Sequence, residues 1–344
     1  MDLKIHFFDD CNPRFWNTNI SNLDRNHHFI TWEVLKYYSA FNGIKNLSFL
    51  VEVEKKIVAA VPLAINKNKK SISFGFNYES CPCPSISKNI TPSLRRKIIK
   101  NILKKVYVLG KRKIKNINFF SHPLLFKKEE LKIDSSDQFE LVKFSKKNII
   151  RNLLIIDLKK TKQTLFGNLS KYHKRNIKKS SEKDIKFNIY NLNSDKEVII
   201  KKFNLFKKLH FKSAGRLTRP EKTWEIMLEQ IFKDKADLFS LSINKGADIS
   251  FLYCGKINGF AWGWTQVNDD NFEREYMPRH TLEWEVILYY KKNKFFFYEL
   301  GERLYASSDK DVTKKELSIS EFKEKYGSES FPKPEFKIDL EQIN

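Results

Sequence analysis

Three side chains in the last quarter of the sequence are of the types that move protons in acyl transfer. Such a transfer to an amine needs a neutral amine, donors for the carbonyl oxygen and a proton for the leaving group. Glu299 ends the apolar run FFFYE, where partial desolvation would raise its pKa and suit a general base. His280 is a second candidate base, and Tyr276 could protonate the leaving group. The structural alternatives are a strand-end ion pair for Glu299, a local hydrogen bond at a helix start for His280 and simple packing for Tyr276.

Two arginines lie together in the stretch FKSAGRLTRPEKTW at 211–224. Gly215 ends one predicted helix and Pro220 sits in the first turn of the next, so Arg216 and Arg219 flank a helix N-terminus. Guanidinium groups bind phosphate or carboxylate at two points. We therefore expect this turn to hold an anionic substrate group, such as the phosphate of a nucleotide sugar or of a lipid-linked sugar. The alternative is that both arginines pair with neighbouring glutamates, Glu221 or Glu225.

A second basic cluster, KYHKRNIKK, has lysines three and four residues apart that would share one helix face. Like charges packed this way favour an anionic partner, although a solvated lysine-rich face is the ordinary explanation. His173 and Arg175 in this cluster are candidate substrate-binding residues.

Two tryptophans alternate in FAWGWTQV and would point to the same face of a strand. Trp262 and Trp264 are therefore candidates for stacking on a sugar ring or a base, with core packing as the alternative. Cys81 and Cys83 have no second cysteine pair, so we expect no metal site.

The net charge is +23 over 344 residues, but only twelve of the 64 basic residues are arginine. A nucleic-acid face would concentrate arginine and aromatic residues, whereas lysine here is spread along the whole chain. A solvated lysine-rich surface, an anionic small substrate and peripheral contact with an anionic membrane are all compatible with the charge. No apolar run is long enough to span a membrane, no signal peptide is recognisable and cysteines are few, so we expect a cytoplasmic protein.

Hydrophobic periodicity predicts a mixed α/β chain. In the first half we expect helices at 31–41 and 91–110, and strands at 47–65 (two, with a turn at Glu54-Lys55), 70–76 and 115–120. In the second half we expect helices at 161–183 (weakened at Gly167), 195–215, 219–234 and 280–293, and strands at 152–158, 185–190, 237–243, 249–254, 258–266 and 295–301, with a turn at Gly255-Lys256.

The element order begins again near residue 150, and no low-complexity linker separates the halves. We predict a lobe at 1–150, a second lobe at 151–335 and a tail at 336–344. A cleft between the lobes would hold the arginine pair and Glu299.

Several motifs, in this order, resemble the FemAB-type branch of the GNAT acyltransferase superfamily. They are SFGFNYESCPCPSI (73–86), LSKYHKRNIKKSSEKDIKF (169–187), HFKSAGRLTRPEKTW (210–224), EYMPRHTLEWEVI (275–287), FYELG (297–301) and ISEFKEKYG (319–327). The resemblance implies two GNAT-like lobes and the transfer of an acyl or aminoacyl group to an amine. The family motif falls on Arg175. The glycine-rich loop with which acetyl-CoA-dependent members hold pyrophosphate is missing here.

The resemblance leaves three functions open. The first is transfer of an acetyl or other acyl group, with acyl-CoA as donor, to the amine of an amino sugar or related cell-surface glycan precursor in a bacterium. The second is an aminoacyl transfer for peptidoglycan with aminoacyl-tRNA as the donor. The basic charge of the chain favours this function, and the lack of a coiled-coil insertion disfavours it. The third is a non-catalytic polyanion-binding protein on a degenerate transferase scaffold.

Overall fold

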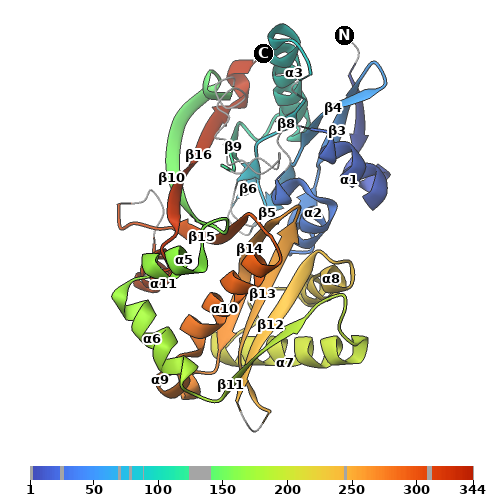
Figure 1. The fold of residues 1–344 in the computed structure, drawn as a ribbon. Coiled ribbons are helices and arrows are strands. Elements are labelled where there is room, and N and C mark those ends of the chain that lie inside the picture. Colours follow the sequence, from blue (N-terminus) through green and yellow to red (C-terminus); the bar gives the residue numbers. More distant parts are fainter. Residues whose placement is uncertain are drawn as a thin grey trace. The chain divides into compact units, whose positions relative to one another are not determined.

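The computed structural model describes residues 3–23, 27–68, 71–76, 80–87, 89–123, 141–243, 246–307 and 312–343 (Figure 1). The chain divides into two compact units, of which the first comprises residues 1–151 and 332–344 and the second residues 152–331. Lys70 of the expected strand at 70–76 and residues 77–79 of the motif at 73–86 lie outside the described residues. No helix within the described ranges combines the length and the apolar character needed to cross a bilayer.

Within its described residues, the first unit contains strands in several sheets and three α-helices. Two sheets have the strand orders β1-β3-β4-β8 and β2-β5-β6, and β10-β16-β9-β7 form one end of a nine-stranded sheet. The strand bounds are β1 Lys4–Phe7, β2 Ile44–Asn46, β3 Phe49–Val53, β4 Lys56–Val61, β5 Ala64–Lys67, β6 Ile72–Phe74, β7 Cys81–Pro82, β8 Ser85–Ile86, β9 Asn116–Phe120 and β16 Glu329–Asp339, and the helices are α1 Pro13–Ser21, α2 Trp32–Ser39 and α3 Pro92–Leu109.

Local signals explain the elements of the first unit that the sequence predicted. The Thr91 side chain accepts a hydrogen bond from the Leu94 amide, Pro92 occupies the first turn, and Gly110 follows the last residue of α3. The β3–β4 hairpin turns at Glu54 and Lys55, whose φ angles of 49° and 61° suit a two-residue hairpin.

The second unit is a mixed sheet in the order β11-β12-β13-β14-β15-β10, with helices on both faces. Its strands are β10 Ser145–Asp157, which begins in the first unit, β11 Ile185–Tyr190, β12 Ala236–Ile243, β13 Asp248–Ile257, β14 Phe260–Asn268 and β15 Phe297–Arg303. Its helices are α5 Lys162–Asn168, α6 Lys171–Ser181, α7 Lys196–Ala214, α8 Glu221–Phe232, α9 Glu273–Tyr276, α10 Pro278–Lys292 and α11 Lys314–Glu324.

Helices cover the central strands of the second unit from both sides, which accounts for the burial of most of their residues. Helix α10 packs on β12, β13 and β14, while α7 and α8 pack against the same sheet through residues such as Phe206 and Trp224 (Figure 1). Every residue of β12 except Ile243 is buried. Leu241 and Leu252 belong to the core that α10 closes.

One predicted turn and one predicted helix differ from the structure. The β13–β14 turn lies at Asn258-Gly259, with φ angles of 47° and 77°, while Gly255 is inside β13. Gly255 is instead required by packing, because a Cβ at that position would overlap the Trp262 ring. The expected helix at 161–183 breaks after Asn168, where Ser170 caps α6 by accepting from the His173 amide.

The close approach of Trp262 predicts a large cost for a methyl group at residue 255. We expect Gly255→Ala to lower the free energy of unfolding by about 1–3 kcal/mol, since the indole must move out of a packed position. The matched control is Gly167→Ala in α5, where an added Cβ has no neighbour within 4 Å and helix propensity favours alanine by up to ~1 kcal/mol. Urea unfolding midpoints measure both. Equal stability of the two variants would contradict the packing argument.

Candidate active site

The parallel strands β14 and β15 pair for only a short distance. Their register joins Phe260–Trp262 to Phe297–Glu299, after which β14 continues to Asn268 while β15 pairs with β10. Each strand also carries a bulge at this point. Trp264 is the extra residue of β14 against β13, and Leu300 is the extra residue of β15 against β10. Because bulges re-aim side chains and end pairing, the two strands diverge here.

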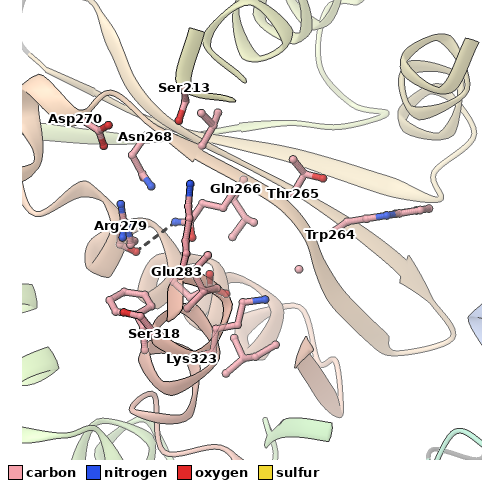
Figure 2. A pocket seen from close by; sticks show the side chains of 17 residues that line it. Ser213, Trp264, Thr265, Gln266, Asn268, Asp270, Arg279, Glu283, Ser318 and Lys323 are labelled. Atoms are coloured by element: carbon pink, nitrogen blue, oxygen red, sulfur yellow. Dashed lines mark hydrogen bonds between the residues drawn. The ribbon is translucent and has the colours of Figure 1, made fainter. Parts of the chain in front are cut away.

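A cavity of about 610 Å³ opens where the strands diverge, and both bulge residues line it (Figure 2). Its wall comes from the end of α7, β13, β14, α10, β15 and α11, all within the second unit. The lining residues are Ser213, Leu252, Gly263, Trp264, Thr265, Gln266, Val267, Asn268, Asp270, Arg279, Glu283, Leu300, Lys315, Ser318, Ile319, Phe322 and Lys323.

Glu283 is the buried carboxylate of this cavity. It is 5% exposed, and the Tyr298 hydroxyl donates a 2.6 Å hydrogen bond to its Oε1. Burial raises the pKa of Glu283, and the Tyr298 hydrogen bond and the Lys323 charge offset part of that rise. A carboxyl group with this balance is suited to accept a proton near neutral pH.

Lys323 on α11 is the cationic counterpart in the same cavity. Burial lowers the pKa of Lys323, against the charges of Glu283 and Glu299, which raise it. The ammonium therefore gives up a proton more easily than an ordinary lysine. Gly263 makes room for this arrangement, because a Cβ there would lie 2.8 Å from the Tyr298 hydroxyl.

The polar side chains of the cavity are unevenly distributed. Figure 2 shows Asn268, Asp270 and Arg279 at one end and Trp264 at the other, with Glu283 between them. The Arg279 backbone carbonyl accepts a 3.3 Å hydrogen bond from the Gln266 side chain, which ties the start of α10 to β14. The cavity thus has a charged end and an aromatic end.

Among the residues predicted from the sequence, Trp264 lines the cavity and Arg219 lies beside it. Arg219 donates a 3.1 Å hydrogen bond to Thr265 Oγ1 and lies 4.8 Å from the Trp224 ring centre. The Trp262 and Trp264 ring centres are 5.8 Å apart, so the two indoles are neighbours.

Arg216 and Arg175 are exposed on the surface of the second unit. The glutamates expected as alternative partners of the arginine pair are instead bonded to lysines, Glu221 to Lys207 and Glu225 to Lys222. Arg175 lies over the ring of Tyr172, 5.4 Å from its centre, and does not line the cavity.

His173 and His280 form an aromatic cluster behind the cavity wall. Their ring centres are 4.8 Å apart, and both contact Phe322, which lines the cavity. Burial lowers the pKa of His173 to about 4 and that of His280 to about 3. His280 Nε2 lies 3.1 Å from the Asn176 amide nitrogen, so it accepts that hydrogen bond as a neutral imidazole.

Tyr276 and Glu299 also lie outside the cavity lining. Tyr276 is half-buried at the end of α9, where its carbonyl accepts from Ser180. Glu299 is buried in β15, next in sequence to Tyr298, so its side chain leaves the opposite face of the strand. Its charge nevertheless acts on Lys323.

Sequence reasoning missed Glu283, Lys323 and Arg279. Glu283 lies in HTLEWEVILYY, a helix segment buried on nearly all sides, and an acid in such a segment is itself a signal of a site. Lys323 lies within the motif ISEFKEKYG, whose lysines cannot be told apart by type alone.

No family model and no curated protein matches the sequence. Several solved structures match over nearly the whole chain. FemX is 13% identical, with a TM-score of 0.68 over 99% of this chain and 98% of that one. A conserved protein of unknown function from Bacteroides thetaiotaomicron is 10% identical, with a TM-score of 0.59 over 98% and 100%. L-PGS from Bacillus licheniformis is 11% identical, with a TM-score of 0.57 over 94% and 90%. The chain therefore shares the fold of FemX and of L-PGS, and the predicted mixed α/β class is confirmed.

The buried histidine pair predicts a loss of stability in mild acid. Both imidazoles are neutral in the folded protein, but their pKa in the unfolded chain is near 6.5, so the unfolded state binds more protons below that pH. Stability should be complete above pH 6.5 and fall on acidification toward pH 4, with roughly 2–4 kcal/mol lost by about pH 5.

The double variant His173→Gln, His280→Gln tests this origin. Urea unfolding at a series of pH values should show a shallower decline for the variant than for the wild type. The same slope in both proteins would mean that the titration belongs to other groups.

Proposed function

We propose that the protein is an N-acyltransferase whose reaction takes place in the cavity between β14 and β15. The observation that carries this proposal is the placement of Glu283 and Lys323 in one cavity, opened where two parallel strands diverge. The likeness of the fold to FemX supports the same class of reaction.

In the proposed reaction the acceptor amine attacks the carbonyl carbon of an activated acyl group. A C–N bond forms, the bond from the carbonyl carbon to the leaving group breaks, and Glu283 accepts the amine proton. Lys323 stabilises the negative charge that develops on the carbonyl oxygen and supplies the leaving group with a proton. Tyr298 keeps Glu283 oriented through its hydrogen bond and does not itself reach the cavity lining.

The segment that connects β14 to α10 bears on the choice of donor. Residues 269–277, DDNFEREYM, contain no glycine and carry four acidic side chains. A pyrophosphate needs close backbone approach and positive potential, so this segment does not fit the diphosphate of coenzyme A. Acyl-CoA remains a donor that the motifs suggest, and an aminoacyl ester carried on tRNA is the alternative, which needs no site for the diphosphate of coenzyme A.

The acceptor is proposed to be an amine attached to an anionic carrier, such as an amino sugar of a cell-surface glycan precursor. Arg279 and Lys315 line the cavity and Arg219 adjoins it, so phosphate or carboxylate groups on the carrier would be held near the attacking amine. In this proposal Arg219 has the anion-binding role that the sequence suggested for it.

Replacing Glu283 by Gln should lower the rate of amide formation by about 10²–10⁴-fold, because the amide keeps the shape and the Tyr298 contact but cannot accept a proton. Glu285→Gln is the matched control, since Glu285 is on the same helix, is half-buried and lies outside the cavity lining. Radiolabelled acetyl-CoA and aminoacyl-tRNA are tested in parallel with a UDP-linked amino sugar as acceptor. Comparable activity of the two variants would refute the assignment of the base.

A further inference from the structure

Leu217 is the most exposed large apolar side chain in the described part of the chain, at 75% of its full exposure. It lies in the sequence GRLTRP, between Arg216 and Arg219, after the end of α7. A single exposed leucine is common on protein surfaces, so its position on the molecule decides whether it has a role.

The segment that carries Leu217 is fixed at both ends to the cavity wall. Ser213, in the last turn of α7, lines the cavity, and Gly215 then ends the helix in the left-handed conformation with φ of 63°. Beyond the tip, Arg219 is hydrogen-bonded to Thr265, which also lines the cavity. We call residues 213–219 the mouth loop. Both of its ends contact the cavity wall, so the loop lies at the rim of the cavity with Leu217 near its tip.

Helix α11 supplies a second part of the rim with the same character. Ile319 is 43% exposed and lines the cavity, as does the exposed Lys315. Exposed apolar and cationic side chains thus occur together on two separate elements around one opening.

The mouth loop and the first two residues of α11 carry exposed cations. Arg216, Lys314 and Lys315 are exposed cations. Among the acids, Asp269 pairs with Lys212 at 3.3 Å and Glu316 is engaged in capping α11, which leaves Asp270 as an exposed acid in the cavity lining. This agrees in sign with the net charge of +23 for the chain.

A phosphate backbone would attract the cations but would gain nothing from an exposed leucine, since single-stranded nucleic acid is bound by aromatic stacking and positive charge. An anionic bilayer satisfies both features, because leucine enters the interfacial region while arginine and lysine meet the lipid phosphates. We propose that the mouth loop and the exposed face of α11 dock on an anionic membrane surface, with Leu217 inserted at the interface. The proposal concerns binding alone and stands whichever acyl group is transferred.

The test is co-sedimentation of the full chain with vesicles of phosphatidylcholine alone and of phosphatidylcholine mixed with phosphatidylglycerol. We expect binding to the anionic vesicles only. Leu217→Asp should weaken it roughly tenfold or more, through loss of the apolar contact and addition of a repelled charge. Arg216→Ala should weaken it about fivefold, as for one cation near an anionic surface.

Leu205→Asp is the matched control, because Leu205 is a 41% exposed leucine on α7, about two turns from the end of the helix. It should bind vesicles as the wild type does, apart from the small effect of one added charge. Equal weakening by the two aspartate substitutions, or no weakening by Leu217→Asp, would overturn the proposal. Binding to bulk tRNA in place of vesicles would also overturn it and assign the basic rim to nucleic acid.

Discussion

The candidate site depends on a 2.6 Å hydrogen bond from the Tyr298 hydroxyl to the Glu283 carboxyl group, made inside the sheet–helix interface of the second unit. An ionised carboxylate in such a place is costly unless donors and a nearby cation compensate it. Tyr298 supplies the donor and Lys323 supplies the charge, so Glu283 is neither fully stabilised as an anion nor fully forced to be neutral. The glycine at 263 is a condition for this contact, because a side chain there would take the place of the Tyr298 hydroxyl.

The surrounding fold makes the space in which that carboxyl group can act. Strands β14 and β15 separate after three paired residues, and the bulges at Trp264 and Leu300 turn those two side chains into the opening. The regular part of the sheet in the second unit is covered by helices on both faces. The cavity lies where the pairing of β14 and β15 ends, and the charged residues Glu283, Arg279 and Lys323 approach it from the helices on either side of β15 in the sequence.

Much of the fold followed from the sequence because its signals are local. Thr91, Asp195 and Gly215 mark helix ends by their own side-chain or backbone chemistry, and each is found in that role. The break at Leu169-Ser170 was not predicted, because the helix was expected to be only weakened at Gly167 and the capping hydroxyl of Ser170 was overlooked. Gly255 was predicted to lie in a turn. Glycine is required there because the Trp262 ring of the neighbouring strand packs against it, and no local sequence pattern records such a contact.

The site was harder to predict from the sequence, because it also depends on contacts between segments that are distant in the chain. Glu299 was chosen because it ends an apolar run, and His280 because it begins a helix. Alternation along β15 brings Tyr298, not Glu299, to the face that meets Glu283. His280 lies one turn before Glu283 on α10, but it packs among aromatic rings with Phe322. The bulges that define the cavity depend on pairing register, which cannot be read from one strand alone.

The titration of the Glu283 carboxyl group tests the central claim most directly. Carbon-13 resonances of the glutamate side chains, assigned with Glu283→Gln, give the midpoint for this one group. The account predicts a midpoint above the ordinary value of 4.5, and a further rise when Lys323 is replaced by Met, because the cation that favours the ionised form is removed. A midpoint at or below 4.5, unmoved by the loss of Lys323, would contradict it.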